Sequence, residues 1–438
     1  MFKRIPFTFV RFAVGAALCV LLGSCQDPAE TPAPAPAPRD RTVPLESARA
    51  IGEEPTIRVR IAAEAAAVTA GGGPTVLVRP VDVARGRQFR APVRVTRADG
   101  AFVLSTGAGD FRWTAGRLHL EGVNGRPVTI EGTRYPGAVV LVPLQYRGRE
   151  TGHFDVINHV SLETYLPGVI ERELWPRWEA AAFEAQAIAA RSYALFERRM
   201  NSERHYDLSS TTSSQVYGGA GSNATALAAV RATRGQVLTY DGRVLPAFYS
   251  SCCGGTSQSA AVAFARLGRG VDLPPLRSRQ RPAWCAPSRH HRWGPITRRA
   301  SVLAQRMARW GRDHEHAIAQ LRGLRRINVT ARSEAGRPAQ FTVTDARGRR
   351  YTLWAEQFRF ACNHAVTGLP ELAFDEQLRS SHVQPTVHGG MVRFTGGRGW
   401  GHGVGMCQWG AQGMATHGYD GRTILRQFYP EADVQRVY

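Results

Sequence analysis

Apolar and polar residues alternate along much of the first third of the chain. The period of two is clear over residues 56–61, 93–96 and 118–122, and glycines and the Asn124-Gly125 pair separate such stretches. Because successive side chains of a strand point to opposite faces of a sheet, this alternation is typical of half-buried β-strands. The pattern predicts a β-rich region over residues 51–150, which carries no chemical signature of its own.

Two later stretches have helical character. Residues 179–199 are rich in Ala, Glu and Arg, which are strong helix formers, and Pro176 stands where such a helix could begin. Within residues 301–325, apolar residues such as Leu303 and Met307 recur near the helical period. We therefore expect a helix in each stretch.

The remaining segments mix the two periodicities. Residues 237–251 are strand-like, residues 327–354 alternate like a hairpin, and the chain from Val392 onward is first glycine-rich and then helical. Strands and helices occur without a regular βαβ repeat, which favours the α+β class.

The N-terminus has the features of an export signal. Lys3 and Arg4 precede an apolar run over residues 12–24, which is too short to span a bilayer comfortably. Leu22-Gly23-Ser24-Cys25 resembles a bacterial lipobox, which implies cleavage before Cys25 and lipidation of its thiol. A signal followed by an unmodified cysteine is the alternative.

A linker over residues 26–50 follows the signal peptide and lipobox of residues 1–25. Proline alternates with other residues over 31–38, which is typical of a stiff, extended tether. We expect a lipoprotein anchored in a membrane of the cell envelope and facing the periplasm. Gln26 after the lipid cysteine favours the outer membrane.

The charge is strongly basic. Lys and Arg total 56 against 35 acidic residues, a net charge of +21, and Lys3 is the only lysine. Loss of Lys3, Arg4 and Arg11 with the signal would leave +18. Such a charge favours polyanionic surroundings, although a GC-rich coding sequence alone would also enrich arginine. Export and the lack of an RNP-like aromatic pattern argue against nucleic acid as a partner.

The sequence contains no Walker, GxSxG or HExxH signature. Two other segments have unusual residue patterns. Residues 160–195 contain Glu173, directly before Leu174-Trp175-Pro176, in what we expect to be a turn that enters a helix. If leucine and tryptophan bury this carboxyl, its pKa is raised, as a general acid requires. Three neighbouring carboxyls are also candidates for the general acid: Glu163, Glu171 and Glu179. The alternative interpretation of Glu173 is a solvated charge at the start of a helix.

The second segment is residues 399–411, within a stretch from Gly396 to Gly413 in which 8 of 18 residues are glycine. Together the two segments resemble the SpoIID/LytB family, which contains a lytic transglycosylase of sporulation and an amidase modifier. The resemblance spans about residues 55–438. It implies a mixed SpoIID-like fold with a catalytic core over 151–260, a helical insertion over 261–345 and a glycine-rich part over 346–438 that completes the core.

The resemblance also implies a reaction. Glu173 matches the family's catalytic glutamate, and the implied activity is cleavage of the MurNAc–GlcNAc bond of peptidoglycan strands, denuded of peptides, to a 1,6-anhydromuramyl product. No cofactor is required for it. The alternative is a non-catalytic peptidoglycan-binding lipoprotein that modulates an amidase partner. Glu184 stands where the family often has lysine, and this departure favours the alternative.

Six further residues match family positions and would bind substrate. Four of them have a structural alternative: an internal ion pair for the arginine, loop scaffolding for the two residues of the polar loop 207–219, and a satisfied structural histidine. The six residues are Arg191, Tyr193, Gln215, Tyr217, His402 and Gln408.

Of seven cysteines, Cys19 would leave with the signal and Cys25 would take lipid, so five remain. A disulfide from Cys252 or Cys253 to Cys285 suits an oxidising compartment. The same cysteines with the His290-His291 pair could instead bind zinc, as the resemblance implies for a clostridial relative. Thiols that do neither are the third alternative, so we commit to no metal ligand.

Overall fold

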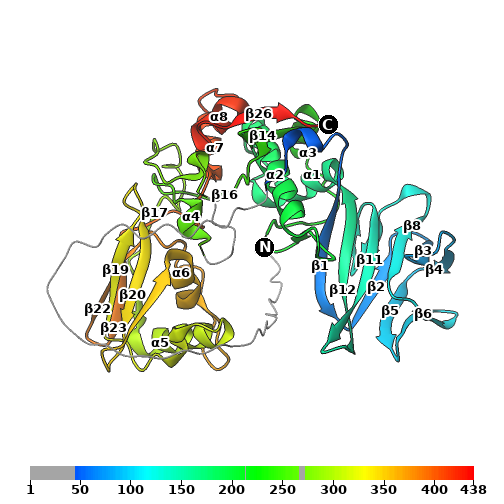
Figure 1. Cartoon of the computed structure of the whole chain (residues 1–438), viewed down its shortest axis with the longest axis horizontal. Coiled ribbons are helices and arrows are strands. Elements are labelled where there is room, and N and C mark those ends of the chain that lie inside the picture. The colour runs from blue at the N-terminus through cyan, green and yellow to red at the C-terminus, as the bar shows by residue number, and fades with distance from the viewer. Residues whose placement is uncertain (1–44, 213, 266–271) are drawn as a thin grey trace. The chain divides into compact units, whose positions relative to one another are not determined.

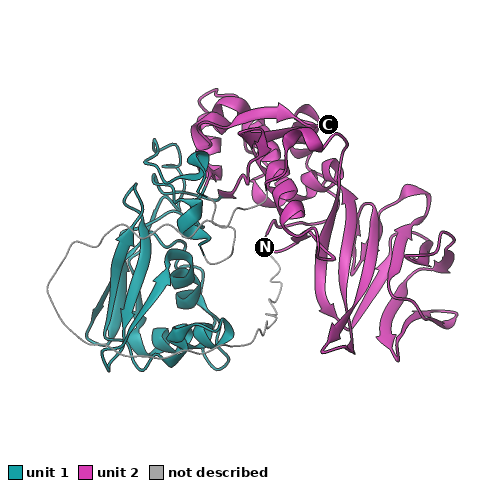
Figure 2. Cartoon of the chain, viewed as in Figure 1, with its two compact units in different colours: residues 1–41, 250–404 teal, residues 42–249, 405–438 magenta. Residues whose placement is uncertain are grey.

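The computed structural model describes residues 45–212, 214–265 and 272–438 (Figure 1). They form two compact units, which Figure 2 shows in different colours. We call residues 45–249 with 405–438 the core unit, and residues 250–404 the inserted unit. The insertion was predicted over 261–345, but it runs on to Val404, because later strands pair with its earlier ones.

The core unit contains two large sheets that confirm the β-rich prediction. One has seven strands in the order β13-β1-β12-β11-β8-β3-β4, and the other has six in the order β10-β9-β2-β5-β6-β7. The strands are β1 (Thr56–Ala65), β2 (Ala67–Gly71), β3 (Thr75–Pro80), β4 (Arg87–Arg90), β5 (Val93–Ala98), β6 (Ala101–Thr106), β7 (Gly109–Trp113), β8 (Leu118–Gly122), β9 (Val128–Ile130), β10 (Thr133–Tyr135), β11 (Ala138–Tyr146), β12 (Arg149–Ser161) and β13 (Leu208–Ser209).

The alternation in the sequence corresponds to burial in these strands. In β5, Val93, Val95 and Arg97 are buried while the residues between them are more exposed. β1 pairs antiparallel with β12 and places Thr56 opposite Ser161. This register matters because β12 leads directly into the helical part of the core unit.

Helices and a small sheet complete the core unit. The sheet has the order β15-β14-β26. These elements are α1 (Leu162–Glu173), α2 (Ala180–Met200), α3 (Ala224–Ala232), α7 (Gln408–Ala415), α8 (Gly421–Phe428), β14 (Gln236–Tyr240), β15 (Arg243–Val244), β25 (Met406–Cys407) and β26 (Asp433–Arg436). β16 (Tyr249–Ser250) lies at the boundary of the units.

Helix α1 corrects the expected position of Glu173, which is the last residue of this helix and not part of a turn entering the next. The next helix, α2, begins at Ala180 rather than at Pro176. The sequence did not predict α1 because it contains Pro167 and Gly168, and both residue types normally interrupt helices. Glycine is required there because the Gly219 carbonyl oxygen would lie 1.9 Å from a Cβ at position 168.

The inserted unit has its own hydrophobic core, formed by residues such as Leu303, Met307, Phe341 and Phe394. The predicted hairpin region forms the sheet β19-β20-β21, and a second sheet has the order β18-β23-β22. The elements are α4 (Ala260–Ala263), α5 (Ala300–Asp313), α6 (Ala355–Asn363), β17 (Arg292–Trp293), β18 (Ile296–Arg299), β19 (Arg326–Arg332), β20 (Pro338–Thr344), β21 (Arg350–Trp354), β22 (Gln384–His388), β23 (Met391–Thr395) and β24 (Gly397–Arg398).

The helix predicted over 301–325 is shorter than expected. α5 ends at Asp313, and Glu315 adopts a positive φ of 50° that a helix cannot continue through. A 3₁₀ turn, Ala317–Gln320, follows. The mixture of strands and helices in both units confirms the α+β class.

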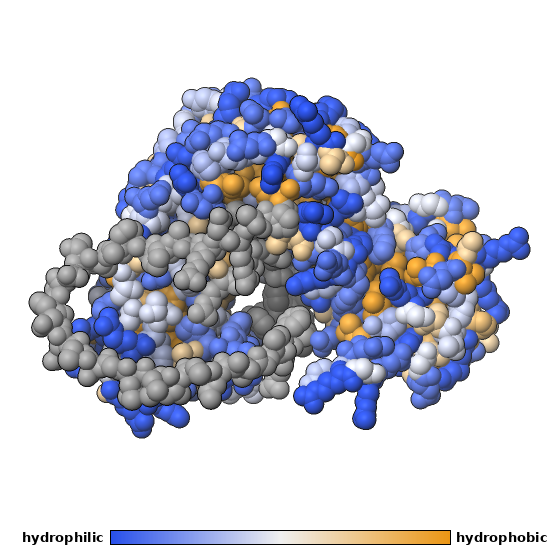
Figure 3. Space-filling view, in the orientation of Figure 1, coloured by the Kyte–Doolittle hydropathy of each residue, from blue (hydrophilic) through white to orange (hydrophobic). Residues whose placement is uncertain are grey.

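The predicted leader, Cys25 and most of the linker lie outside the described residues. The end of the predicted linker is not a tether, since the 3₁₀ turn Ala48–Ala50 packs on the core unit and the Ala48 N–H donates to the Gly242 carbonyl at 3.0 Å. Within the described part, none of the helices combines the length and apolarity needed to cross a bilayer. On the face shown in Figure 3, hydrophilic residues cover most of the surface and hydrophobic residues form small patches.

Candidate active site

The carboxyl of Glu173 lies at the C-terminal end of α1, where α7 meets it. The side-chain amide of Gln408, the first residue of α7, donates to Glu173 Oε2 at 3.0 Å. Burial raises the pKa of Glu173, although hydrogen bonds from Gln408 and from the Val216 backbone N–H act in the opposite direction. The predicted raised pKa is therefore present, and Gln408 is placed beside the acid that the sequence singled out.

The predicted apolar wall around Glu173 is only half correct. Leu174 is buried, but Trp175 is 54% exposed. Two tyrosines lie near the carboxyl: Tyr165, on the same helix, and Tyr249, which is distant in sequence. The negative charge of Glu173 contributes, after burial, to raising the pKa values of Tyr165 and Tyr249, so both phenols lie close to it electrostatically.

Gln215 connects these two tyrosines. Its Oε1 accepts a hydrogen bond from the Tyr165 hydroxyl at 3.1 Å, and its Nε2 donates to the Tyr249 hydroxyl at 2.9 Å. The same Nε2 also donates to the Ala190 carbonyl of α2 at 3.2 Å. Gln215 is buried, so this geometry fits a residue that holds the two tyrosine side chains in place rather than one that contacts substrate.

Arg191 is engaged inside the protein. Its guanidinium donates to both carboxylate oxygens of Glu163, at 2.9 and 2.8 Å, and to the backbone carbonyl of Gln236 at 3.0 Å. Burial would raise the pKa of Glu163, but Arg191 and the Tyr438 hydroxyl hold it below its usual value. With Arg191 fully buried, this arrangement favours the internal ion pair over direct substrate contact.

The other glutamates that competed with Glu173 have structural surroundings. Glu163 belongs to the Arg191 pair, and the carboxylate of Glu171 accepts the backbone N–H groups of Ser222 and Asn223 at 2.8 and 3.1 Å. Glu179 is exposed at the N-cap of α2. Glu173 is thus the member of this set that combines a raised pKa with partial exposure.

The remaining predicted binding residues separate into two groups. Tyr193 and Tyr217 are buried in the core unit, and the Tyr217 hydroxyl donates to Asn158 Oδ1 at 3.0 Å. His402 lies in the inserted unit, where its Nδ1 accepts the Val404 N–H at 3.0 Å. Glu184, the departure from the family pattern, lies on α2 beside Gly421 of α8.

Pattern analysis did not single out Gln186. This residue of α2 is fully buried, and neither its amide nitrogen nor its oxygen has a hydrogen-bond partner in the part of the chain that the structure describes. It lies one turn before Ala190 and two before Tyr193, on the α2 face that meets Gln215 and Tyr249. A single amide within an otherwise apolar run, Ala185 to Ala190, is the signal that could have found it.

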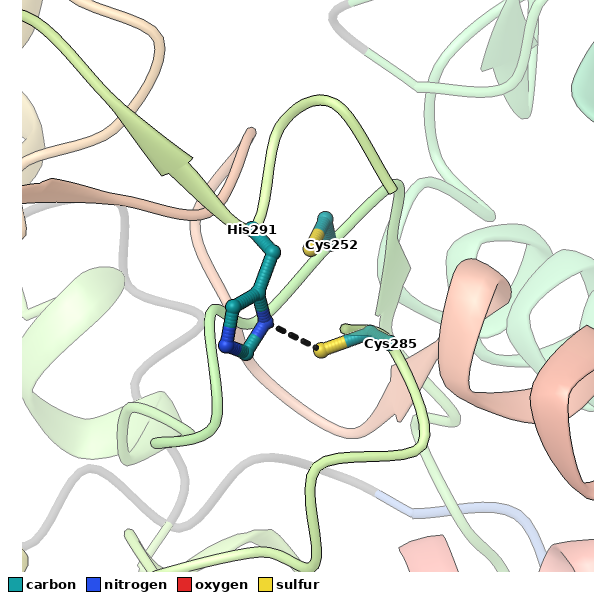
Figure 4. Close-up of side chains that lie close together, drawn as sticks. All are labelled: Cys252, Cys285 and His291. Carbon is teal, nitrogen blue, oxygen red and sulfur yellow. Dashed lines mark hydrogen bonds between the residues drawn. The ribbon is translucent and has the colours of Figure 1, made fainter. Parts of the chain in front are cut away.

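A second cluster of chemically active side chains occurs in the inserted unit. The ligand atoms of Cys252, Cys285 and His291 all lie within 4.8 Å of one another (Figure 4). The Cys285 sulfur is 3.2 Å from His291 Nδ1, and 3.8 Å from the sulfur of Cys253. The latter distance exceeds the roughly 2.05 Å of an S–S bond.

His290 is not part of this cluster, although the sequence paired it with His291. Its ring packs against Trp400, and burial, with the charges of Arg379 and Arg289, lowers its pKa to about 4. Two cysteines and one histidine with this spacing are suitable soft ligands for zinc.

The described residues form an α+β protein with a candidate acid site, the Glu173 carboxyl, on the helical part of the core unit. Residues 150–240, which carry that site from β12 to β14, match the model of the family described as SpoIID, stage II sporulation protein. This segment of the chain is thus similar to the SpoIID family.

Three curated proteins are similar in sequence over most of this chain. An uncharacterized protein of Brachyspira hyodysenteriae is 28% identical over 312 residues, covering 70% of this chain and 73% of the relative. The amidase enhancer of Bacillus subtilis is 24% identical, over 78% of this chain and 52% of its own length. Stage II sporulation protein D of Bacillus amyloliquefaciens is 24% identical, over 64% of this chain and 76% of its own.

Proposed function

We propose that this protein is a peptidoglycan lytic transglycosylase in which Glu173 is the acid. The observation that carries the proposal is a carboxyl whose pKa is raised by burial and which remains partly exposed at the end of α1. A role in the cell wall is supported by the match of residues 150–240 to the SpoIID family and by the amidase enhancer among the similar proteins.

The number of carboxyls favours transglycosylation over hydrolysis. Ordinary glycoside hydrolysis uses two carboxyl groups, one as acid and one as base or nucleophile. Among the described residues, the hydrogen-bond partners that act on the pKa of Glu173 are the Gln408 side chain and the Val216 backbone, and neither is a carboxyl. A single carboxyl suffices when the substrate supplies its own nucleophile.

The proposed reaction takes place in two proton transfers. Protonated Glu173 donates to the oxygen between MurNAc and GlcNAc as the bond from that oxygen to C1 of MurNAc breaks. The C6 hydroxyl oxygen of the same MurNAc then bonds to C1, and the Glu173 carboxylate takes the hydroxyl proton. The product is a 1,6-anhydro ring, Glu173 is protonated again, and water is not consumed.

Product analysis tests this proposal directly. Purified full-length protein is incubated with amidase-treated, peptide-free glycan strands, and 1,6-anhydromuramyl ends are measured by mass spectrometry. We expect Glu173→Gln to lower the rate by about 10²- to 10⁴-fold, the usual contribution of a general acid. Glu179→Gln, which changes an exposed carboxyl on the same segment, is the matched control and keeps its activity. Absence of the product, or equal product from Glu173→Gln, overturns the proposal.

The alternative is a wall-binding protein that modulates an amidase. It is supported by the similarity to the amidase enhancer of Bacillus subtilis, of which this chain covers 52%. Stimulation of a purified peptidoglycan amidase by wild type and Glu173→Gln alike, with no anhydro product from either, favours this second candidate.

For Cys252, Cys285 and His291 we propose a structural zinc site. Two thiol sulfurs and one imidazole nitrogen within 4.8 Å, with both thiols buried, would supply three of the four ligands that a structural zinc ion takes. Metal analysis of protein purified without chelator, beside Cys285→Ser and a Cys362→Ser control, tests the site. A metal-free wild type, or a Cys253–Cys285 disulfide found by non-reducing peptide mapping, contradicts it.

We also propose an envelope location, as a lipoprotein anchored through Cys25 that faces the periplasm from the outer membrane. Membrane fractionation of Cys25→Ala beside wild type tests the anchor. Equal membrane retention of both proteins argues against it.

A further inference from the structure

Trp175 is exceptional among the tryptophans of this protein. All nine lie in the described residues, and it is the one whose side chain is exposed, at 54%. The exposed part of a large aromatic ring contributes little to folding. An indole exposed beside a polar site offers an apolar face, with a polar N–H at its edge, that a ligand can cover. The sequence predicted this ring as part of the wall that buries Glu173, so its exposure calls for another role.

The turn that presents Trp175 is anchored on both sides. Before it, the Leu174 N–H donates to the Ile170 carbonyl at 3.0 Å and ties the turn to α1. After it, the Trp178 N–H donates to the Trp175 carbonyl at 3.0 Å, and the Trp178 ring packs edge-on against Trp409 with centroids 5.1 Å apart. The indole therefore sits on a turn held in place by α1 and α7.

The same helix that anchors the turn also holds the acid. Gln408 of α7 donates to Glu173, while Gln412, one turn later, accepts the Glu179 N–H at 2.9 Å. Glu173 and Trp175 are two residues apart, which limits their Cα separation to about 7 Å. An extended ligand whose bond is protonated by Glu173 would therefore pass close to the turn that carries Trp175.

We propose that Trp175 is a stacking platform for a pyranose ring of the glycan strand, in the subsite next to the bond at Glu173. Resting on the proposed function, this assigns a further substrate-binding residue to it. A pyranose with equatorial substituents presents a flat face of C–H groups, which are apolar and weakly positive. An indole ring is the largest aromatic surface available to cover such a face, and its negative π-face attracts those hydrogens.

Binding measurements in a non-cleaving background test the platform. All variants carry Glu173→Gln, and the probe is a peptide-free oligosaccharide of alternating GlcNAc and MurNAc, titrated by calorimetry. We expect Trp175→Ala to weaken binding about tenfold, the loss typical of one aromatic contact, and Trp175→Phe to retain most of the affinity. Tyr146→Ala, which removes another exposed aromatic ring of the core unit, is the matched control and binds as the parent does.

The outcomes separate this proposal from the catalytic one. Equal affinity of parent and Trp175→Ala overturns the platform, as does an equal loss in Tyr146→Ala or no saturable binding by the parent. Melting temperatures exclude unfolding as the cause of a loss, because an exposed ring contributes little to stability. If wild type forms no anhydro product while Trp175→Ala still weakens binding, the transglycosylase proposal fails and the glycan platform stands.

Discussion

At the residue scale, two buried glutamines have opposite surroundings. Gln186 and Gln215 are both fully buried, but Gln215 bonds to two tyrosines and a backbone carbonyl, whereas the amide of Gln186 lacks partners within the described residues. A buried polar group without a hydrogen bond costs free energy, and a bonded one leaves unsatisfied partners when it is removed.

This contrast predicts opposite effects of one substitution. We expect Gln186→Leu to raise the free energy of unfolding by about 1 kcal/mol, and Gln215→Leu to lower it by about 1–3 kcal/mol. Urea unfolding of the two variants beside wild type measures both. A loss of stability in Gln186→Leu equal to that in Gln215→Leu would show that Gln186 does have internal partners.

A second prediction at this scale concerns pH. Glu173 must be protonated to donate, so activity is expected to fall as pH rises through its raised pKa. The Gln408 hydrogen bond favours the carboxylate, so Gln408→Leu should raise the pKa further and move the alkaline limb to higher pH.

The pH profile of kcat/KM measures this shift. Gln412→Ala serves as the control, because Gln412 lies on the same helix but contacts the Glu179 backbone. An alkaline limb that stays in place or moves to lower pH in Gln408→Leu would contradict the assignment of Glu173 as the titrating acid.

At the element scale, the ion pair between α1 and α2 connects the two helices that carry the site. Glu163 lies in the first turn of α1 and Arg191 in the middle of α2, and their charged atoms are 2.8 Å apart with almost no exposed surface. Removing one member of such a pair leaves a buried charge without compensation.

We therefore expect Arg191→Met to lower the free energy of unfolding by about 3–5 kcal/mol. The double variant Glu163→Gln/Arg191→Met should recover part of this loss, since neither charge remains. Breaking the exposed pair Arg112–Asp99 with Arg112→Met is the control and should cost at most about 1 kcal/mol. A loss of activity in Arg191→Met at unchanged stability would instead support direct substrate contact.

At the scale of the whole molecule, the chain leaves the core unit after Tyr249 and returns to it at Gly405. Each unit has its own buried residues, with Leu166 in the core unit and Leu303 in the inserted unit. Units with separate hydrophobic cores can open separately, at different free energies.

Hydrogen exchange by mass spectrometry tests this division. Leu166→Ala and Leu303→Ala each remove a buried side chain and should cost about 2–5 kcal/mol. We expect faster exchange mainly in 45–249 and 405–438 for Leu166→Ala, and mainly in 250–404 for Leu303→Ala. Equal acceleration throughout the chain for either variant would show a single cooperative structure.

Sequence pattern alone is enough for the features that depend on neighbouring residues. The sequence around Glu173 and the family resemblance selected this residue as the acid, which stays a prediction. Alternation located β1, β5 and β8, and composition located α2. These succeed because side-chain periodicity and propensity act within a few residues. Helix α1 was not predicted because Pro167 and Gly168 are unusual inside a helix. Packing against Gly219 explains the need for Gly168.

Only the tertiary structure decided how Glu173 is surrounded. Gln408 reaches it across 235 residues of sequence, after the chain has passed through an entire inserted unit. Arg191 is buried and forms an ion pair with Glu163. Trp175 is exposed and does not cover the Glu173 carboxyl as the sequence predicted. Burial and exposure depend on which distant segments pack together, and no periodicity in a single chain records that information.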